Sequence, residues 1–395
     1  MEIGYFFVFM TVVGAIIQVS TYIRLYKYMD ADLARRPESY KPKASIILPC
    51  KGLDPDFKKN IERLFLQDYP HFQIIFAVAE ESDPAYKPLF QLCQKHPGRA
   101  DIVVAGFHPH RAQKVNNQLC ALQLVQPDSE VIAFVDSDVI ALNNFLTHLV
   151  APLKDTSIGV TTGYRFYVSN NWDLPSIIRG FWNRMSSVEL IDKKYAFAWG
   201  GAMAIRREVF ERARIAEHWD NSADDDMSLT KAIKELGLRV HFVTKCTVTS
   251  EGRATVAEIL EWTNRQMILT KVYYPELWRR AIGRSFIMLL WTVFMFWTLY
   301  LAIEQNSQDL FSAFWIGVAI FPLEIFLIMV SRSLWNRILG VEVSHMYEPF
   351  WLCCIAVPLA HICLPFMTLY SVLTNKVQWR GVTYNLKSAT ELVIE

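Results

Sequence analysis

The stretch EVIAFVDSD, residues 130–138, decides how this chain is interpreted. Its apolar residues 131–135 fit a buried strand, and two acids one residue apart, Asp136 and Asp138, follow at once. In open α/β folds, ligand crevices form at the ends of such strands. Two carboxylates at this spacing can share one hard cation, and Mg2+ is usually held by one or two carboxylates plus substrate phosphates. The stretch predicts the metal site of a nucleotide-diphosphate enzyme. The alternative is a solvated turn, because Asp and Ser favour turns.

The composition indicates a membrane protein. A chain of 395 residues would ordinarily form one large or two medium soluble domains, but 52% of these residues are hydrophobic, with 25 Phe and 12 Trp. The net charge of +1 gives no field that would attract nucleic acid, so we expect no nucleic-acid partner. The seven cysteines are scattered without metal-ligand spacing, which is typical of reduced thiols in a cytosolic domain.

Four apolar stretches are long enough to be membrane segments. Residues 3–23 carry no charge and are followed by Arg24 and Lys27, which predicts a retained anchor and a cytosolic domain after it. If the last stretch crosses the membrane, the basic tail lies outside, against the positive-inside rule. Pro358 and Pro365 would instead allow a broken or re-entrant segment, and both possibilities stay open. The three C-terminal stretches are residues 285–303, 310–330 and 350–373.

A soluble α/β domain is predicted between the anchor and the later apolar segments. Strand-like runs at residues 44–49, 73–79 and 131–135 alternate with helical spacing, which favours a mostly parallel sheet with helices on both faces. Residues 254–280 mix aromatic and basic side chains, as in a helix lying in the membrane interface. We therefore expect a transmembrane anchor (1–28), a cytosolic catalytic domain (41–253), amphipathic interface helices (254–283), a C-terminal transmembrane region (284–374) and a tail (375–395).

A second acidic cluster, Asp224 to Asp226, precedes a helix whose apolar face is Leu229, Ala232, Ile233 and Leu236. Helix capping accounts for one acid and contributes about 1 kcal/mol. Three adjacent acids exceed that need and repel one another. Crowded carboxylates raise a pKa and can tune one of them as a base. A catalytic role is therefore favoured over capping.

The chain resembles inverting GT-A glycosyltransferases, and more narrowly the ceramide glucosyltransferase group and its bacterial lipid-glycosylating relatives. The resemblance implies a Rossmann-like, mostly parallel α/β catalytic domain plus transmembrane helices. It also implies a UDP-sugar donor and Mg2+ or Mn2+. The stretches that carry it lie between residues 45 and 386 and are LPCKGLDPDFKKNIERLFLQDYP, AEESDPAY, DSD, KVNNQL, GGAMAIRREVF, DDDMSLTKAIKELG and WRGVTYNL.

The resemblance implies roles for residues on the donor side. Glu80 takes the position of the acid that contacts the nucleotide base or ribose, with Asp83 close by; the alternative for both is a solvated loop. Lys114 resembles the lysine that approaches the diphosphate. Asp136 and Asp138 resemble the metal-binding pair, and Asp136 also belongs to the predicted donor site.

On the acceptor side, the spacing to Leu229 and Gly237 aligns Asp226 with the general base of the family and Asp225 with its acidic neighbour. The base takes a proton from the acceptor hydroxyl while that oxygen attacks the anomeric carbon. Gly200 and Gly201, preceded by Trp199, resemble the small-residue loop beneath the sugar and acceptor, although a simple turn is the alternative.

One motif departs from the family. Its catalytic domain normally ends with (Q/R)-x-x-R-W, and the aligned residues here are 265–269, RQMIL. Arg265 survives as a predicted phosphate contact, but Ile268 and Leu269 replace the Arg-Trp pair. Lys271 or a basic residue of the WRGVTY tail is the expected substitute. The loss also counts against a processive synthase, whose glycan usually stacks on that Trp.

These features predict an integral membrane hexosyltransferase. It would move glucose from UDP-glucose, with inversion, onto a lipid hydroxyl such as that of ceramide at the cytoplasmic face. That face belongs to a bacterial inner membrane, or to the Golgi or ER in a eukaryote. A processive polysaccharide synthase would need more spanning helices. A non-catalytic nucleotide-sugar-binding membrane protein fits the lost Arg-Trp but not the intact acids. A transporter would not need the large soluble domain.

Overall fold

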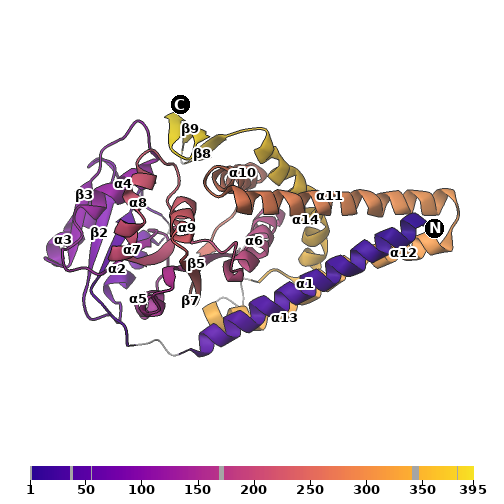
Figure 1. Ribbon diagram of the computed structural model, residues 1–395, viewed down its shortest axis with the longest axis horizontal. Coiled ribbons are helices and arrows are strands. Elements are labelled where there is room, and N and C mark those ends of the chain that lie inside the picture. Colours follow the sequence, from indigo (N-terminus) through magenta and orange to yellow (C-terminus); the bar gives the residue numbers. More distant parts are fainter. Residues whose placement is uncertain (1, 36–38, 55, 169–172, 340–346, 380) are drawn as a thin grey trace.

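A seven-stranded sheet forms the centre of the soluble lobe. The computed structural model describes residues 2–35, 39–54, 56–168, 173–339, 347–379 and 381–395 (Figure 1). The strand order is β3-β2-β1-β4-β6-β5-β7, and only β6 runs antiparallel to its neighbours. The predicted mostly parallel α/β fold is therefore confirmed. The strands are β1 Ala44–Pro49, β2 Phe72–Val78, β3 Ala100–Val104, β4 Val131–Val135, β5 Ile158–Val168, β6 Ala202–Arg206 and β7 Arg239–Glu251.

Both faces of the sheet are covered, which explains why its central strands are continuously apolar. Along β4, Ala133 packs into one core and its neighbours Ile132 and Phe134 into the other. The first core includes side chains of α2, α3 and α5, and the second includes α4, α7, α8 and α9. The helices are α2 Phe57–Phe65, α3 Tyr86–Lys95, α4 Gln113–Leu122, α5 Phe145–Val150, α6 Leu174–Ser187, α7 Arg207–Arg212, α8 Ile215–Trp219 and α9 Asp226–Glu235, with short 3-10 turns at η1 Ala151–Lys154 and η2 Val188–Ile191.

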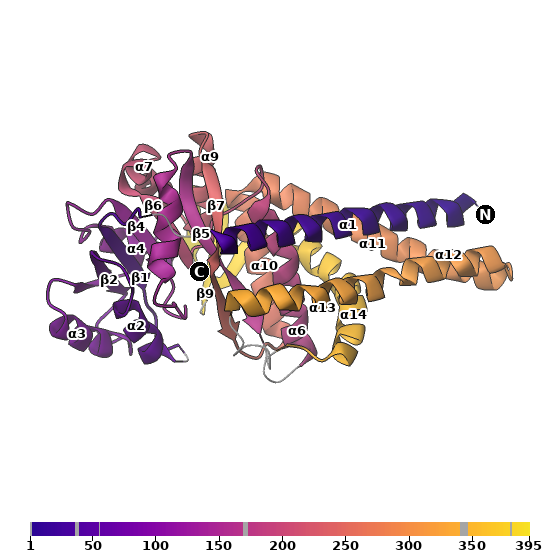
Figure 2. The same cartoon turned by 90° about the horizontal axis from the view of Figure 1, so that it is seen from below.

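Long apolar helices extend from one end of this lobe (Figures 1 and 2). Within the described residues, four helices are long and apolar enough to cross a membrane. They are α1 Glu2–Ala34, α11 Pro275–Glu304, α12 Gln308–Val318 continued by α13 Ile320–Leu339, and α14 Phe350–Leu369 continued by η4 Tyr370–Val372. The first three extend beyond the predicted apolar stretches. Length and composition therefore indicate a membrane protein.

The predicted interface region is divided between two helices. α10, Val256–Tyr273, begins with a capping box formed by Thr255 and Glu258. It ends at Tyr274, whose backbone is non-helical, and Pro275 then starts α11. The residue before a proline is disfavoured in the helical region, which explains the break. α10 therefore packs with the lobe, and α11 leads away from it.

The C-terminal tail folds back onto the soluble lobe, an arrangement that was not predicted from the sequence. Strands β8 Lys376–Trp379, β9 Val382–Ser388 and β10 Glu391–Ile394 form a small antiparallel sheet. Tyr384, Leu386 and Leu392 are buried in the same core as α4 and α9. The tail thus lies on the same side of the apolar helices as the soluble lobe.

Helix α14 returns the chain to that lobe. It contains Pro358 and Pro365 yet remains one helix, and in both views it runs across the direction of α11 and α13 (Figures 1 and 2). Half of its most apolar window is buried inside the protein, against a third or less for the other three candidates. The sequence left open whether this segment crosses the membrane or is re-entrant. The folded tail agrees with the second interpretation, in which α14 does not carry the chain to the opposite side of the apolar region.

A buried polar contact joins three of these helices. The Glu324 carboxylate of α13 lies 2.7 Å from Nε2 of His361 in α14 and accepts a hydrogen bond from Gln18 of α1. Polar side chains among apolar helices are held by one another because the surrounding lipid has no partners for them. We interpret this contact as one that fixes the position of the three helices relative to one another.

The packing of the tail can be tested with Leu386→Ala. Removing a fully buried leucine should destabilise the core by about 2–5 kcal/mol, which lowers the melting temperature of the detergent-purified protein by about 4 °C or more. Val393→Ala on the neighbouring strand is the control, since Val393 is 45% exposed and its loss should change little. Equal melting temperatures for the two variants would contradict the docked tail.

Candidate active site

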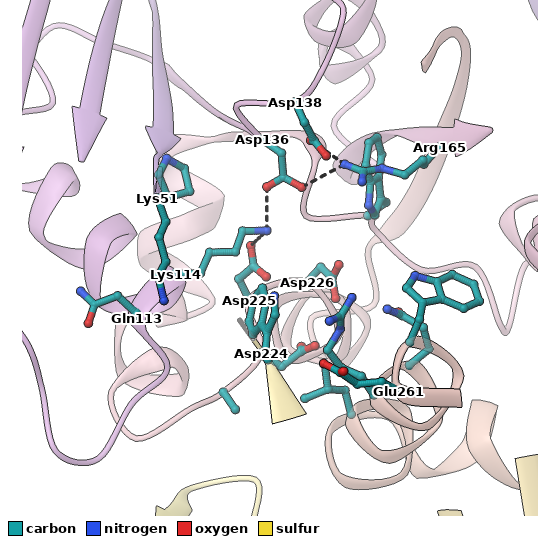
Figure 3. A pocket seen from close by; sticks show the side chains of 18 of the residues that line it. Lys51, Gln113, Lys114, Asp136, Asp138, Arg165, Asp224, Asp225, Asp226 and Glu261 are labelled. Atoms are coloured by element: carbon teal, nitrogen blue, oxygen red, sulfur yellow. Dashed lines mark hydrogen bonds and ion pairs between the residues drawn. The ribbon is translucent and has the colours of Figure 1, made fainter. Parts of the chain in front are cut away.

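The two predicted acid groups line a single cavity of about 560 Å3. Asp136 and Asp138 reach it from the end of β4, and Asp225 and Asp226 from the start of α9 (Figure 3). Other walls come from the end of β1, the first turn of α4, one side of α10 and the small C-terminal sheet. The two acid groups, which lie far apart in the sequence, therefore meet at one site.

Lys114 links the two acid groups. Its ammonium lies 3.0 Å from Oδ1 of Asp136 and 2.9 Å from Oδ2 of Asp225 (Figure 3). One helical turn further along α4, Gln118 donates to the same Asp225 oxygen at 2.8 Å. Burial by itself would lower the pKa of Lys114, but Asp136, Asp225 and Asp226 raise it above its usual value. Lys114 is therefore a permanent positive charge between the acids.

Asp136 and Asp138 share a second cation, which was not predicted from the sequence. Arg165 of β5 places Nη2 2.7 Å from Oδ1 of Asp138 and 3.5 Å from Oδ2 of Asp136 (Figure 3). Its guanidinium lies 4.9 Å from the centre of the Trp199 ring. The available signal was a single charged residue inside the apolar run GYRFYV, a position that needs a buried partner.

The geometry of this pair suits a divalent cation. One oxygen of each carboxylate approaches the same guanidinium nitrogen, so the two side chains converge on one cation position. Hard oxygen donors of this kind match Mg2+ or Mn2+. The described residues contain no group of three or more His, Cys, Asp or Glu side chains able to hold a metal. Phosphate oxygens of a donor, together with water, would complete the coordination.

The three adjacent acids occupy different environments. Asp224 accepts hydrogen bonds from the backbone N–H groups of Met227 (2.7 Å) and Ser228 (3.1 Å), so the capping alternative accounts for this one acid. Asp225 pairs with Lys114, and Asp226 accepts from Gly200 N at 2.7 Å. Burial and the neighbouring charge of Asp225 raise the pKa of Asp226 to about 6, with Lys114 opposing the rise. Asp226 is thus a half-buried carboxyl that titrates near neutral pH.

The glycines before β6 permit close approaches around these acids. A Cβ on Gly200 would lie 2.6 Å from Oδ2 of Asp225, and a Cβ on Gly201 would lie 2.1 Å from the Trp199 ring. Real Cβ atoms are not found at such distances. The small residues therefore let the acidic loop and Trp199 pack against this turn. Trp199 itself lines the cavity.

Glu80 and Asp83 are outside this cavity lining. Glu80 is exposed. The Asp83 carboxylate accepts from Gly52 N at 2.9 Å and Ala85 N at 2.8 Å, which holds the turn that follows β1. Lys51 in that turn does line the cavity. A nucleotide contact by Glu80 or Asp83 stays a prediction.

A model of Glycosyl transferase family 21 matches residues 6–392. The chain belongs to this family. Over 86 residues it is 33% identical to ceramide glucosyltransferase 1 of Caenorhabditis elegans, covering 22% of this chain and 18% of that protein. Over 124 residues it is 30% identical to the ceramide glucosyltransferase of Candida albicans, covering 28% and 22%. The matches therefore span about a fifth of the length of these relatives.

The fold also matches a solved glycosyltransferase structure. A mannosyltransferase from Pyrobaculum calidifontis, in complex with GDP-Man and Mn2+, superposes with a TM-score of 0.54 over 84% of this chain and 97% of that one, at 14% identity. At this identity the likeness concerns the fold alone. This family 21 protein has a GT-A-like domain with long apolar helices attached.

The segment that departs from the family motif, residues 265–269, lies on α10. Its side chains face either the cavity or the core. Arg265 lines the cavity, with its guanidinium 5.5 Å from the Trp379 ring of β8. Ile268, at the position of the family arginine, is fully buried in the core, whereas Leu269 lines the cavity. A cation at position 268 would face apolar side chains instead of a donor.

Of the two expected substitutes for that arginine, Lys271 is not in the cavity wall. Lys271 donates to the carbonyls of Ser371, Val372 and Thr374 and so caps the end of the α14 segment. The basic residue of the tail motif, Arg380, lies outside the described residues. The basic side chains that line the cavity in the described part of the chain are Lys51, Lys114, Arg165, Arg179, Arg253 and Arg265.

A second cavity, of about 200 Å3, adjoins the first. The two share Asp226, Trp199 and Trp262, so Asp226 borders both spaces. From there the second cavity runs between α6, α10 and α11 toward α14. Most of its lining is aromatic or aliphatic, with an Arg284–Glu189 ion pair among the polar groups. The apolar side chains that extend it toward the membrane helices are Trp182, Met185, Met267, Leu277, Ala281, Met288 and Leu364.

Proposed function

We propose that this family 21 protein is an inverting, metal-dependent hexosyltransferase that transfers glucose from UDP-glucose to a hydroxyl group of a membrane lipid. The observation that carries the proposal is the position of Asp226 between the two cavities. One cavity is lined by basic side chains that suit a nucleotide diphosphate, and the other by apolar side chains that suit a lipid. A base placed between them can reach an acceptor hydroxyl beside the sugar.

The site residues support a single in-line displacement. Asp226 takes the proton of the acceptor hydroxyl as that oxygen bonds to the anomeric carbon, and the bond to the phosphate oxygen breaks with its electron pair. Asp136 and Asp138 would hold Mg2+ or Mn2+, whose chemistry is charge neutralisation on the diphosphate. Lys114 keeps Asp225 and Asp136 paired and faces the same phosphates. No enzyme nucleophile is needed.

A lipid acceptor is supported by the second cavity and by the long apolar helices. The cavity leads from Asp226 to Ala281 and Met288 of α11 and Leu364 of α14, which are candidate membrane helices. A lipid with its hydroxyl at Asp226 could keep its apolar part in this space. Ceramide is the nearest analogy, from the names of the partly matching relatives.

We place the lobe on the cytoplasmic side. Arg24, Lys27 and Arg35 lie toward the end of α1 that meets the lobe, and basic residues favour that side of a membrane (Figure 1). The division into anchor, catalytic domain, interface helix and C-terminal membrane region is retained in this proposal. Residues 375–395 are reassigned from a separate tail to the wall of the catalytic lobe, because Trp379 and Tyr384 line the donor cavity.

The direct test uses the full chain in lipid nanodiscs with UDP-sugars and a total lipid extract. Mass spectrometry should detect lipid carrying one added hexose, with UDP-glucose as the preferred donor. A processive synthase would instead yield long glycans, and a non-catalytic binding protein would retain the nucleotide without any product. Either result would refute the proposed transfer.

Asp226→Asn separates catalysis from binding. A general base contributes about 10²- to 10⁴-fold, so transfer should fall by that factor while UDP affinity, measured by calorimetry, stays within about threefold because Asn keeps the shape of the side chain. Asp138→Ala is the matched comparison in the same cavity, and it should remove the metal dependence of UDP binding. Normal turnover by the Asp226 variant would refute the base assignment.

The pH dependence follows from the raised pKa of Asp226, about 6. The base acts as a carboxylate, the form that predominates above the pKa, so kcat should fall about tenfold per pH unit as the pH drops below 6. The measurement is single-turnover transfer between pH 4.5 and 8. The residual activity of Asp226→Asn should lack this acid limb. A wild-type profile that stays flat down to pH 4.5 would contradict the assignment.

Ala281→Trp tests the acceptor cavity. The larger side chain should occupy space between α10 and α11, and overpacking of about 1–3 kcal/mol corresponds to a rise of about 5- to 150-fold in the KM for lipid. UDP binding should be unchanged, because Ala281 borders only the second cavity. Ile287→Trp, at an exposed site on the same helix, is the control. An unchanged KM for lipid in Ala281→Trp would move the acceptor elsewhere.

A further inference from the structure

Arg165 occupies the position that the proposed metal would take. Its side chain is 16% exposed, and its neighbours on β5, Tyr164 and Phe166, are buried in the core. The guanidinium leaves the strand on the other face and enters both cavities. Nη2 contacts one oxygen of Asp138 and one of Asp136 (Figure 3). These are the two oxygens that converge on a single point.

A divalent ion and this guanidinium cannot both use that point. Mg2+ binds carboxylate oxygens at about 2.0–2.1 Å, and two cations sharing one oxygen in a partly buried site repel strongly. Metal binding therefore has to release Arg165 from Asp138. The released side chain remains charged, because a guanidinium is not deprotonated in proteins.

The surroundings of Arg165 offer it a second position inside the cavity. The Trp199 and Tyr167 rings lie 4.9 and 5.9 Å from the guanidinium carbon, and ring faces of this kind stabilise a cation. Among the contacts of the described residues, its Nε is buried and has no hydrogen-bond partner. An arginine fork with an unused donor matches the oxygens of a phosphate.

We infer that Arg165 is an exchangeable counter-cation: it fills the cation position of Asp136 and Asp138 when no donor is bound, and it moves to the donor diphosphate when the metal takes that position. The inference rests on the proposed donor and metal site. It assigns Arg165 the phosphate contact that position 268 cannot supply, since Ile268 is enclosed in the core. Arg165 would thereby couple metal binding to donor binding.

The test measures Mn2+ and UDP binding by the full-length protein in nanodiscs. Free Mn2+ is followed by electron paramagnetic resonance, with and without UDP. Arg165→Gln should bind Mn2+ at least about tenfold more tightly without nucleotide, because the competing charge is gone, and bind UDP about tenfold more weakly with Mn2+ present. These opposite shifts distinguish exchange from a purely structural role, which would weaken both.

Two further variants complete the design. Arg179→Gln is the matched control, because Arg179 lines the same cavity and lies 4.4 Å from the Tyr167 ring but donates to the Gly252 carbonyl; it should leave the Mn2+ affinity unchanged. Arg165→Lys keeps the charge and loses the fork. It should hold Mn2+ affinity near the wild-type value and weaken UDP binding, which keeps the inference testable if Arg165→Gln fails to fold.

The outcomes separate this inference from the proposed function. If the wild type binds Mn2+ with UDP and Arg165→Gln binds Mn2+ no more tightly, the exchange is overturned and the transferase proposal stands. If neither protein binds Mn2+ under any condition, both are overturned. If only Arg165→Gln binds Mn2+, the competition by Arg165 is supported, and the metal dependence of the natural enzyme is refuted.

Discussion

The ammonium of Lys114, held between Asp136 and Asp225, is the interaction on which the rest of the site depends. It joins the end of a central strand to the start of a helix that lies nearly ninety residues later in the chain. Without it, the acids of β4 and α9 would repel one another in a partly buried space, where an unpaired charge costs several kcal/mol. Gly200 helps to keep this ion pair together, because a side chain at that position would displace Asp225 from Lys114.

Under the proposed function, the same charges divide the site into a donor half and an acceptor half. Lys114 and Arg165 face Asp136 and Asp138, and three further basic side chains line the same cavity: Arg179, Arg253 and Arg265. Asp226 lies at the other limit of this group, where aromatic and aliphatic side chains begin. In that proposal, a polar donor in the first cavity and an apolar acceptor in the second can both reach the Asp226 carboxylate.

Sequence patterns predicted the parts of this structure that depend on local chemistry. Apolar runs such as residues 131–135, which alternate with helical spacing, predicted the sheet. The paired acids at the edge of the sheet predicted the cavity. Arg165 was missed because a lone charge in a strand acquires meaning only from its partners, which lie on other elements. The packing of Leu386 and Leu392 could not be predicted either. The pattern of a short β-strand shows which side chains are apolar but not which core they pack into. Glu80 marks the limit of a motif match: the cavity lining does not include it, and its contact with the nucleotide stays a prediction.

The docked tail also bears on how the chain is arranged around a membrane. Basic residues in the tail conflict with the positive-inside rule only if α14 carries them across. Because Leu386 and Leu392 share a core with α4 and α9, the tail and the lobe must occupy one side, whichever side that is. α14 then has to enter and leave the apolar region on the lobe side. Its half-buried surface and its course across α11 and α13 agree with that path, which also brings Leu364 to the second cavity beside Asp226.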